Sequence, residues 1–126
     1  MPSTTSSITE IGRVIIPVAD QDRALAFYTE KLGLDVIADI PFGEGDRWIE
    51  VAPPGARTAV AFGPVLDGRV GVPTGVSFKT PDADALHDEL AARGVDVDDV
   101  IAPPGAPRMF FFRDADSNTL HAAQEV

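Results

Sequence analysis

The chain has 126 residues, a formal net charge of −10 and no cysteine. A hydrophobic share of 44% and a charged share of 24% are typical of one folded globular domain. The negative charge and the scattered basic residues argue against nucleic acid and anionic membranes as partners. Without cysteine, disulfides, thiolate catalysis and zinc-thiolate sites are excluded.

The N-terminal segment is polar and has no obvious structure of its own. We expect residues 1–10 to form a disordered tail and residues 11–126 to form a single domain. The tail has neither the basic start nor the apolar stretch of a secretory signal. No run in the chain approaches the roughly 18 apolar residues that a membrane-spanning helix needs. These features predict a cytoplasmic protein.

The first half of the chain predicts a strand, a helix and three further strands. Residues 13–18 are apolar and β-branched, which favours a strand. Asp20 is a candidate N-cap, and Gly33 a candidate left-handed stop, for a helix with apolar residues at helical spacing. Three strand-like runs separated by Gly- and Pro-containing turns follow, at residues 34–40, 47–51 and 58–62. This βαβββ unit covers about residues 11–63.

The second half repeats this order over about residues 74–124. A strand at 76–80 precedes a helix that begins at Pro81 or Asp82 and ends at Gly94; three strands then follow, at residues 95–101, 109–113 and 119–123. A shift of 61 residues aligns five identities on the helix face, the helix stop and the next strand. Chance similarity between two amphipathic helices is the alternative explanation. The sequence therefore predicts an α+β domain of two βαβββ modules.

Four sequence segments resemble those of a known family. They are IIPVAD at residues 15–20, LAFYTEKLG at 25–33, RWIEVAPPG at 47–55 and FRDADSN at 112–118. Together they resemble the vicinal oxygen chelate superfamily of glyoxalases, bleomycin resistance proteins and extradiol dioxygenases, over about residues 11–124. The resemblance implies that the modules pair into a curved mixed-sheet half-barrel, and that the protein is a homodimer.

The divalent metal site that the resemblance implies is largely missing from this sequence. In the family, four inward-facing side chains commonly hold the metal. The first position falls here on Arg13, whose protonated guanidinium cannot act as an ordinary ligand. The others fall on Thr74 or Gly75, near Ala61, and on His121. We therefore expect no cofactor.

His121 and Glu50 are the two competent donors near these positions. Two donors are too few for a tight metal site, although a divalent metal stays an alternative. As catalytic candidates, His121 or Glu50 could move a proton. A hydrogen-bonded structural histidine is the other interpretation of His121.

Polar and aromatic side chains near the same positions are candidates for contact with a ligand. Arg13 offers a planar donor fork, or else lies at the rim and pairs with Glu50. Trp48 shares a face with Glu50, or else belongs to the core. The run 109–112 must supply both core and pocket residues. The full set of candidates is Arg13, Trp48, Phe62, Thr74, Phe110 and Phe112.

These residues favour a metal-independent small-molecule-binding protein that sequesters a drug or a metabolite. The alternative is a glyoxalase-like lyase or isomerase, or a dioxygenase-type enzyme, that uses His121 or Glu50 with or without a divalent metal. The expected partner is a small organic ligand.

Overall fold

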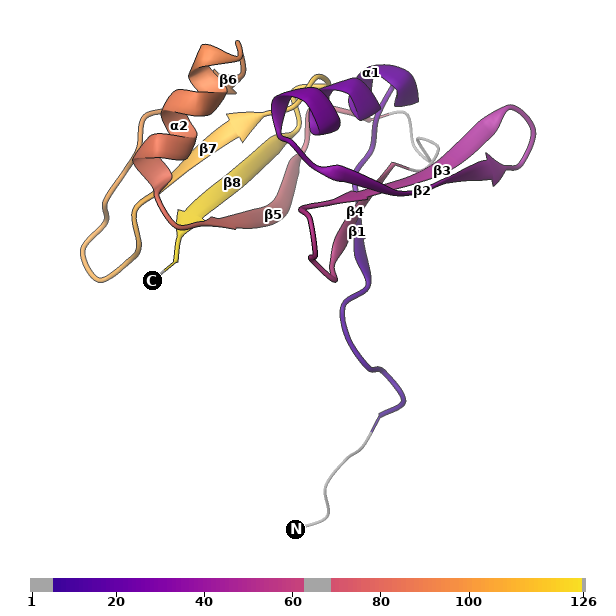
Figure 1. The fold of residues 1–126 in the computed structure, drawn as a ribbon, viewed down its shortest axis with the longest axis horizontal. Helices are drawn as coiled ribbons and strands as arrows, with labels where there is room; N and C mark the ends of the chain where they lie inside the picture. The colour runs from indigo at the N-terminus through magenta and orange to yellow at the C-terminus, as the bar shows by residue number, and fades with distance from the viewer. Residues whose placement is uncertain (1–5, 63–68, 126) are drawn as a thin grey trace.

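Two four-stranded mixed sheets form the framework of the computed structural model, which describes residues 6–62 and 69–125 (Figure 1). The first sheet has the order β1 (Arg13–Ile15), β4 (Ala59–Phe62), β3 (Asp46–Ala52), β2 (Asp35–Phe42). The second has the order β5 (Pro73–Thr80), β8 (Thr119–Gln124), β7 (Met109–Arg113), β6 (Asp96–Val97). In each sheet the first two strands in this order are parallel and the other neighbours antiparallel. This identical order confirms the predicted repeated unit and the α+β fold class.

The helices begin where the sequence predicts. Helix α1 (Gln21–Ala26) is capped by the Asp20 carboxylate, which accepts a hydrogen bond from the Arg23 amide at 3.1 Å. It continues as a π-helical turn, η1 (Phe27–Lys31), and the chain leaves it through Gly33 at a φ of 74°. Helix α2 (Ala83–Ala92) is capped by Asp82 in the same way. No helix of the described residues is long and apolar enough to cross a bilayer.

The strand predicted at residues 95–101 is shorter in the structure. Only Asp96–Val97 form β6, and the chain then touches β7 at two further points. The Asp98 amide donates to the Phe111 carbonyl at 2.8 Å, and Ile101 forms an isolated bridge with Met109. In a regular antiparallel pair, the backbone N–H and C=O groups of the two strands form hydrogen bonds at regular intervals. Residues 98–101 form only some of these hydrogen bonds with β7.

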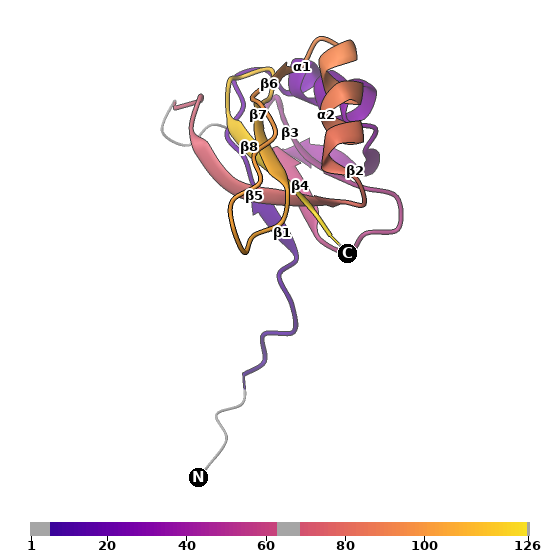
Figure 2. The same ribbon diagram turned by 90° about the vertical axis from the view of Figure 1, so that its left-hand side faces the viewer.

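One hydrophobic core fills the space between the sheets and the helices. Both helices lie on the same side of the two sheets (Figure 2). Strand alternation points one set of side chains toward the helices, and these are buried. The largest of them are Phe62, Phe110, Phe112, Ile49, Leu120 and Val51, which join Tyr28 and Leu90 from the helical side. We call the opposite, helix-free side of each sheet its open face.

A buried polar network, here called the junction network, joins the two modules. One oxygen of Asp114 accepts hydrogen bonds from the amides of Asp116 and Asn118, both at 2.9 Å. Its other oxygen accepts from the Tyr28 hydroxyl at 2.7 Å and from the Asn118 side chain at 3.0 Å. The Asn118 amide group also donates to the Pro17 carbonyl at 2.8 Å. The C-terminal turn is thereby fastened to the beginning of the first module.

Two further contacts hold the modules together. The Asp116 carboxylate accepts from the Arg23 guanidinium at 2.7 Å and from the Ala19 amide at 3.3 Å. At the ends of the helical segments, Lys31 donates to the Arg93 carbonyl at 2.7 Å, and Arg93 donates to the Lys31 carbonyl at 2.8 Å. The relative placement of the two sheets is therefore fixed by polar contacts as well as by the shared core.

Candidate functional site

On the open face of the first sheet, three predicted site residues form one cluster. Arg13 belongs to β1, and Trp48 and Glu50 lie two positions apart on β3, which places them on one side of the strand. One carboxylate oxygen of Glu50 accepts from Arg13 Nε at 2.9 Å and from Trp48 Nε1 at 2.7 Å. We call this group the Arg–Trp–Glu cluster. The pairing of Arg13 with Glu50, one of the two interpretations of Arg13, is present.

The Arg–Trp–Glu cluster leaves part of Arg13 available. Within the described chain, its two terminal nitrogens make no hydrogen bond, and its side chain is 49% exposed. Glu50 is only 14% exposed and fixes the guanidinium through Nε. Beside the cluster, the Phe42 ring lies 5.7 Å from that of Trp48, and Ile40 is paired with Trp48 across the strands. The open face of the first sheet thus combines an apolar surface of aromatic and aliphatic side chains with the guanidinium of Arg13, held in a fixed orientation.

On the open face of the second sheet, His121 lies in a row with two residues from neighbouring strands. Ser77 on β5 and Phe111 on β7 are both in register with His121 on β8. The Ser77 hydroxyl is 2.7 Å from His121 Nδ1, and the Phe111 ring centroid is 4.8 Å from that of the imidazole. We call this set the Ser–His–Phe row. Ser77 was not among the predicted site residues, because its pairing with His121 depends on the register of two strands far apart in sequence.

A hollow of about 310 Å³ lies over the Ser–His–Phe row. Thr74 lines this hollow, but its hydroxyl donates to the Thr119 carbonyl at 2.8 Å and accepts from the Val76 amide at 3.1 Å. Because that hydroxyl already makes two hydrogen bonds to the backbone, Thr74 lines the hollow mainly through its apolar atoms. The lining is Pro73, Thr74, Gly75, Val76, Ser77, Phe111, Thr119, Leu120 and His121.

The three predicted ligand-contacting phenylalanines lie on the core side of their strands. Phe62 and Phe110 are 0% exposed and Phe112 is 1% exposed. On β7, alternation turns Phe110 and Phe112 inward and leaves Phe111 on the open face, where it is 38% exposed. The structure brings Phe111, rather than its two neighbours, beside His121.

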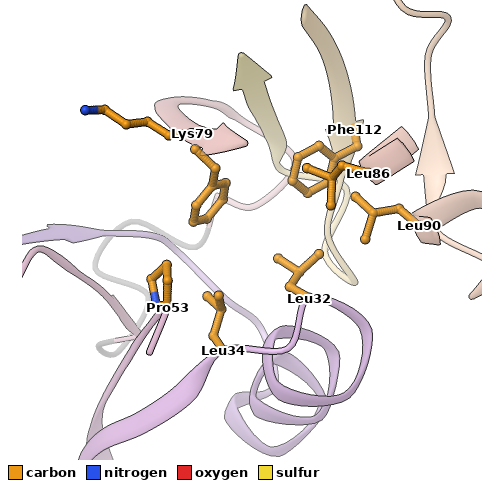
Figure 3. Close-up of a pocket in the computed structure, with 8 residues that line it drawn as sticks. Leu32, Leu34, Pro53, Lys79, Leu86, Leu90 and Phe112 are labelled. Atoms are coloured by element: carbon orange, nitrogen blue, oxygen red, sulfur yellow. The ribbon is translucent and has the colours of Figure 1, made fainter. Parts of the chain in front are cut away.

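Phe112 also borders a second, smaller space between the modules, with a volume of about 160 Å³ (Figure 3). Leu32 and Leu34 reach it from the first module, and Leu86 and Leu90 from α2. Lys79 is at its edge, with its ammonium directed away from the leucines. This space has an apolar lining and lies apart from the Ser–His–Phe row.

The donor atoms of the described chain do not fit a divalent metal. Among residues 6–62 and 69–125, no three His, Cys, Asp or Glu side chains come together as a possible metal site. His121 and Glu50 lie on different sheets, and Glu50 already accepts two hydrogen bonds. Arg13 keeps its proton and cannot replace the missing ligand. Structural and catalytic zinc sites have three or four protein donors.

Comparison with known proteins places this geometry in a family. Residues 10–122 match the model of the glyoxalase/bleomycin resistance protein/dioxygenase superfamily. Among curated proteins, uncharacterized YetH of Bacillus subtilis is 35% identical over 91 residues, which are 71% of this chain and 76% of YetH.

Solved structures show the same relationship. TnmS3, an antibiotic-binding protein from Streptomyces sp. CB03234, is 34% identical with a TM-score of 0.87, and the match covers 97% of this chain and 100% of TnmS3. A superfamily member from Sphaerobacter thermophilus is 35% identical, also with a TM-score of 0.87, over 94% of this chain and 98% of that protein. The chain therefore belongs to the glyoxalase/bleomycin resistance protein/dioxygenase superfamily.

Proposed function

We propose that this protein binds a small aromatic organic molecule, such as an antibiotic or a metabolite, on its open faces and needs no metal to do so. The observation that carries the proposal is the Arg–Trp–Glu cluster. Where a metal-dependent relative would present ligands, this chain presents a guanidinium fixed by Glu50 beside an aromatic floor. The similarity to the antibiotic-binding TnmS3 supports the same ligand class. The cytoplasmic location expected from the sequence is part of this proposal.

Trp48 makes binding directly measurable, because it is the single tryptophan of the chain. We expect its fluorescence to change saturably when metal-free protein is titrated with bleomycin and a panel of aromatic antibiotics. Arg13→Lys removes the planar fork and should weaken binding of a responding compound about tenfold, the effect of losing one charge-assisted hydrogen bond. Arg57→Lys is the matched control, because Arg57 is 82% exposed and pairs with Glu10 outside the cluster.

Two results would contradict this proposal. The first is the absence of any fluorescence response or rise in melting temperature across the panel, since a ligand that binds only the folded state must stabilise it. The second is binding that appears only after manganese, nickel or zinc is added. His121→Ala tests the enzymatic alternative, in which turnover of a bound compound should collapse, whereas simple binding should weaken only modestly.

We also propose a homodimer, in which a second copy covers part of the exposed apolar surface. Ile15, on the open face of the first sheet, is 59% exposed. In the segment before β1, Ile8 is 82% exposed and Ile11 72% exposed. Exposed apolar groups of this kind are typical of interaction surfaces. Light scattering should give twice the monomer mass, and a monomer mass at every concentration would contradict the dimer.

A further inference from the structure

The space between the modules, here called the inter-module space, is large enough to hold a molecule of its own. We infer that it is a second binding site, which takes a neutral apolar molecule about the size of benzene. The inference is independent of the proposed function, because the Arg–Trp–Glu cluster and the Ser–His–Phe row lie on the open faces of the sheets. The lining of the inter-module space is Leu32, Leu34, Pro53, Phe78, Lys79, Leu86, Leu90 and Phe112.

The size and the wall of the inter-module space indicate the kind of ligand. Its volume is about 160 Å³. An apolar cavity of about 150 Å³ lined by leucine, isoleucine and phenylalanine stays free of water and binds benzene or xenon. Leucine and phenylalanine side chains also dominate the lining here (Figure 3). The rings of Phe78 and Phe112, with centroids 6.3 Å apart and planes inclined by 29°, give part of the wall an aromatic surface.

Backbone groups around the inter-module space already make hydrogen bonds, which argues against water as its occupant. The Leu34 amide donates to the Tyr28 carbonyl at 3.0 Å, and the Pro53 carbonyl accepts from the Ala56 amide at 2.9 Å. Lys79, at the edge, directs its ammonium away from the leucines (Figure 3). A buried water molecule needs two to four polar partners. The inter-module space therefore suits an apolar molecule better than water.

Polar contacts beside the inter-module space keep the modules from closing it. Lys31, which precedes Leu32, donates to the Arg93 carbonyl at 2.7 Å, and Arg93 donates to the Lys31 carbonyl at 2.8 Å. Moving the modules together would displace these partners and those of the junction network. Side chains that border an empty space lack van der Waals contacts on that side, and a ligand of matching size restores them.

Benzene is the probe, and leucine methyl signals show where it binds. In ¹H–¹³C spectra of leucine-methyl-labelled protein, we expect saturable shifts of the leucines in the lining, with a dissociation constant of about 1 mM, well within the bound for a ligand of six heavy atoms. The Trp48 indole and His121 ring signals should stay in place, because these residues lie on the open faces. Shifts that do not saturate, or that centre on Trp48 or His121, would overturn the inference and leave the proposed function standing. The reporting leucines are Leu32, Leu34, Leu86 and Leu90.

Filling the inter-module space should exclude the probe. Leu86→Phe adds volume to the lining from α2 and should weaken benzene binding by at least about tenfold. Leu25→Phe is the matched control, because Leu25 is a half-buried leucine of α1 that does not line the space, and it should bind benzene as the wild type does. Leu32→Phe fills the space from the first module and serves as a second test if Leu86→Phe does not fold. An unchanged affinity in either filled variant would overturn the inference.

A second probe of the same shape tests the apolar class. Pyrazine is a six-membered aromatic ring like benzene but carries two nitrogen acceptors. It should bind at least about tenfold more weakly, because its nitrogens would leave water without gaining donors in the inter-module space. Equal affinities for benzene and pyrazine would overturn the apolar ligand class.

Discussion

The Tyr28 hydroxyl is a buried donor at the contact between the modules. Burial, followed by the charge of Asp114 and the hydrogen bond to it, raises the pKa of Tyr28 well above its ordinary value of 10.0. Because the folded state holds this proton more tightly, the stability it contributes is fully present below pH 10 and is lost as the pH rises above that value.

This shift can be observed directly, since Tyr28 is the single tyrosine of the chain. We expect no tyrosinate absorbance while the protein stays folded, and a cooperative rise in absorbance only when alkali unfolds it. Far-ultraviolet circular dichroism over the same pH range supplies the unfolding curve. A tyrosinate signal near pH 10 with the fold intact would contradict the burial and hydrogen bonding described for this residue.

At the residue scale, the sequence identified what depends on local pattern and missed what depends on register. Alternation along one strand places Trp48 and Glu50 on the same face, and family resemblance adds Arg13. Ser77 became recognisable only through its pairing with His121 on a strand 44 residues away. For Phe111, alternation gives two sets of side chains on the strand but does not say which set faces the helices.

At the element scale, local signals defined most of the secondary structure. Carboxylate caps and left-handed glycines are short-range features. Asp20 caps α1 as predicted, and of the two starts predicted for the second helix, Pro81 or Asp82, the structure has Asp82 as the cap of α2. The π-helical turn at Phe27–Lys31 was not predicted, because helical spacing does not distinguish it from an α-helix over one turn. The shortened β6 reflects contacts with β7 that the sequence alone does not reveal.

Arg113 joins β6 and the residue after it to β7 through side-chain hydrogen bonds, a link that we call the Arg113 tie. From β7, its guanidinium donates to both oxygens of Asp96 at 2.9 and 3.1 Å, and to both oxygens of Asp98 at 2.8 and 2.7 Å. These hydrogen bonds hold the pKa of Asp96 and Asp98 below the ordinary value of 3.8. Because both pKa values are lowered in the folded state, the tie is present above that value and is lost as the pH falls below it.

We therefore expect Arg113→Gln to increase hydrogen exchange at the backbone amides of residues 96–98. Relative to intrinsic rates, the difference from wild type should be clear at pH 6 and should shrink at pH 3, where protonation begins to weaken the wild-type tie. Arg108→Gln, which breaks a similar pair with Asp84, is the control and should leave exchange in this segment unchanged. Equal protection in Arg113→Gln and wild type at pH 6 would count against the role of this tie.

At the scale of the whole molecule, the fold separates stability from recognition. The core and the junction network lie on the helical side and between the modules, whereas the Arg–Trp–Glu cluster and the Ser–His–Phe row lie on the open faces. The cluster and the row can therefore vary in sequence without disturbing the core. This arrangement is compatible with a superfamily in which one scaffold carries different site residues.

Asn118 makes polar contacts with both modules. It is 0% exposed, accepts from the Gly71 and Val72 amides at 2.9 and 3.1 Å, and donates to the Pro17 carbonyl at 2.8 Å. Asn118→Ala leaves these backbone groups without their partner. Since each unsatisfied buried group costs about 1–3 kcal/mol, we expect the free energy of unfolding to fall by about 3 kcal/mol or more.

Urea unfolding followed by two probes measures this effect. Trp48 fluorescence reports on the first module, and circular dichroism reports on both. The two curves should coincide in the wild type and separate in Asn118→Ala, because the modules lose part of their polar connection. Ser117→Gly is the matched control in the same turn: Ser117 has a φ of 61°, which glycine adopts without strain, so stability should be unchanged or slightly higher. An unchanged midpoint in Asn118→Ala would show that the hydrogen bonds of Asn118 contribute little to the stability of the protein.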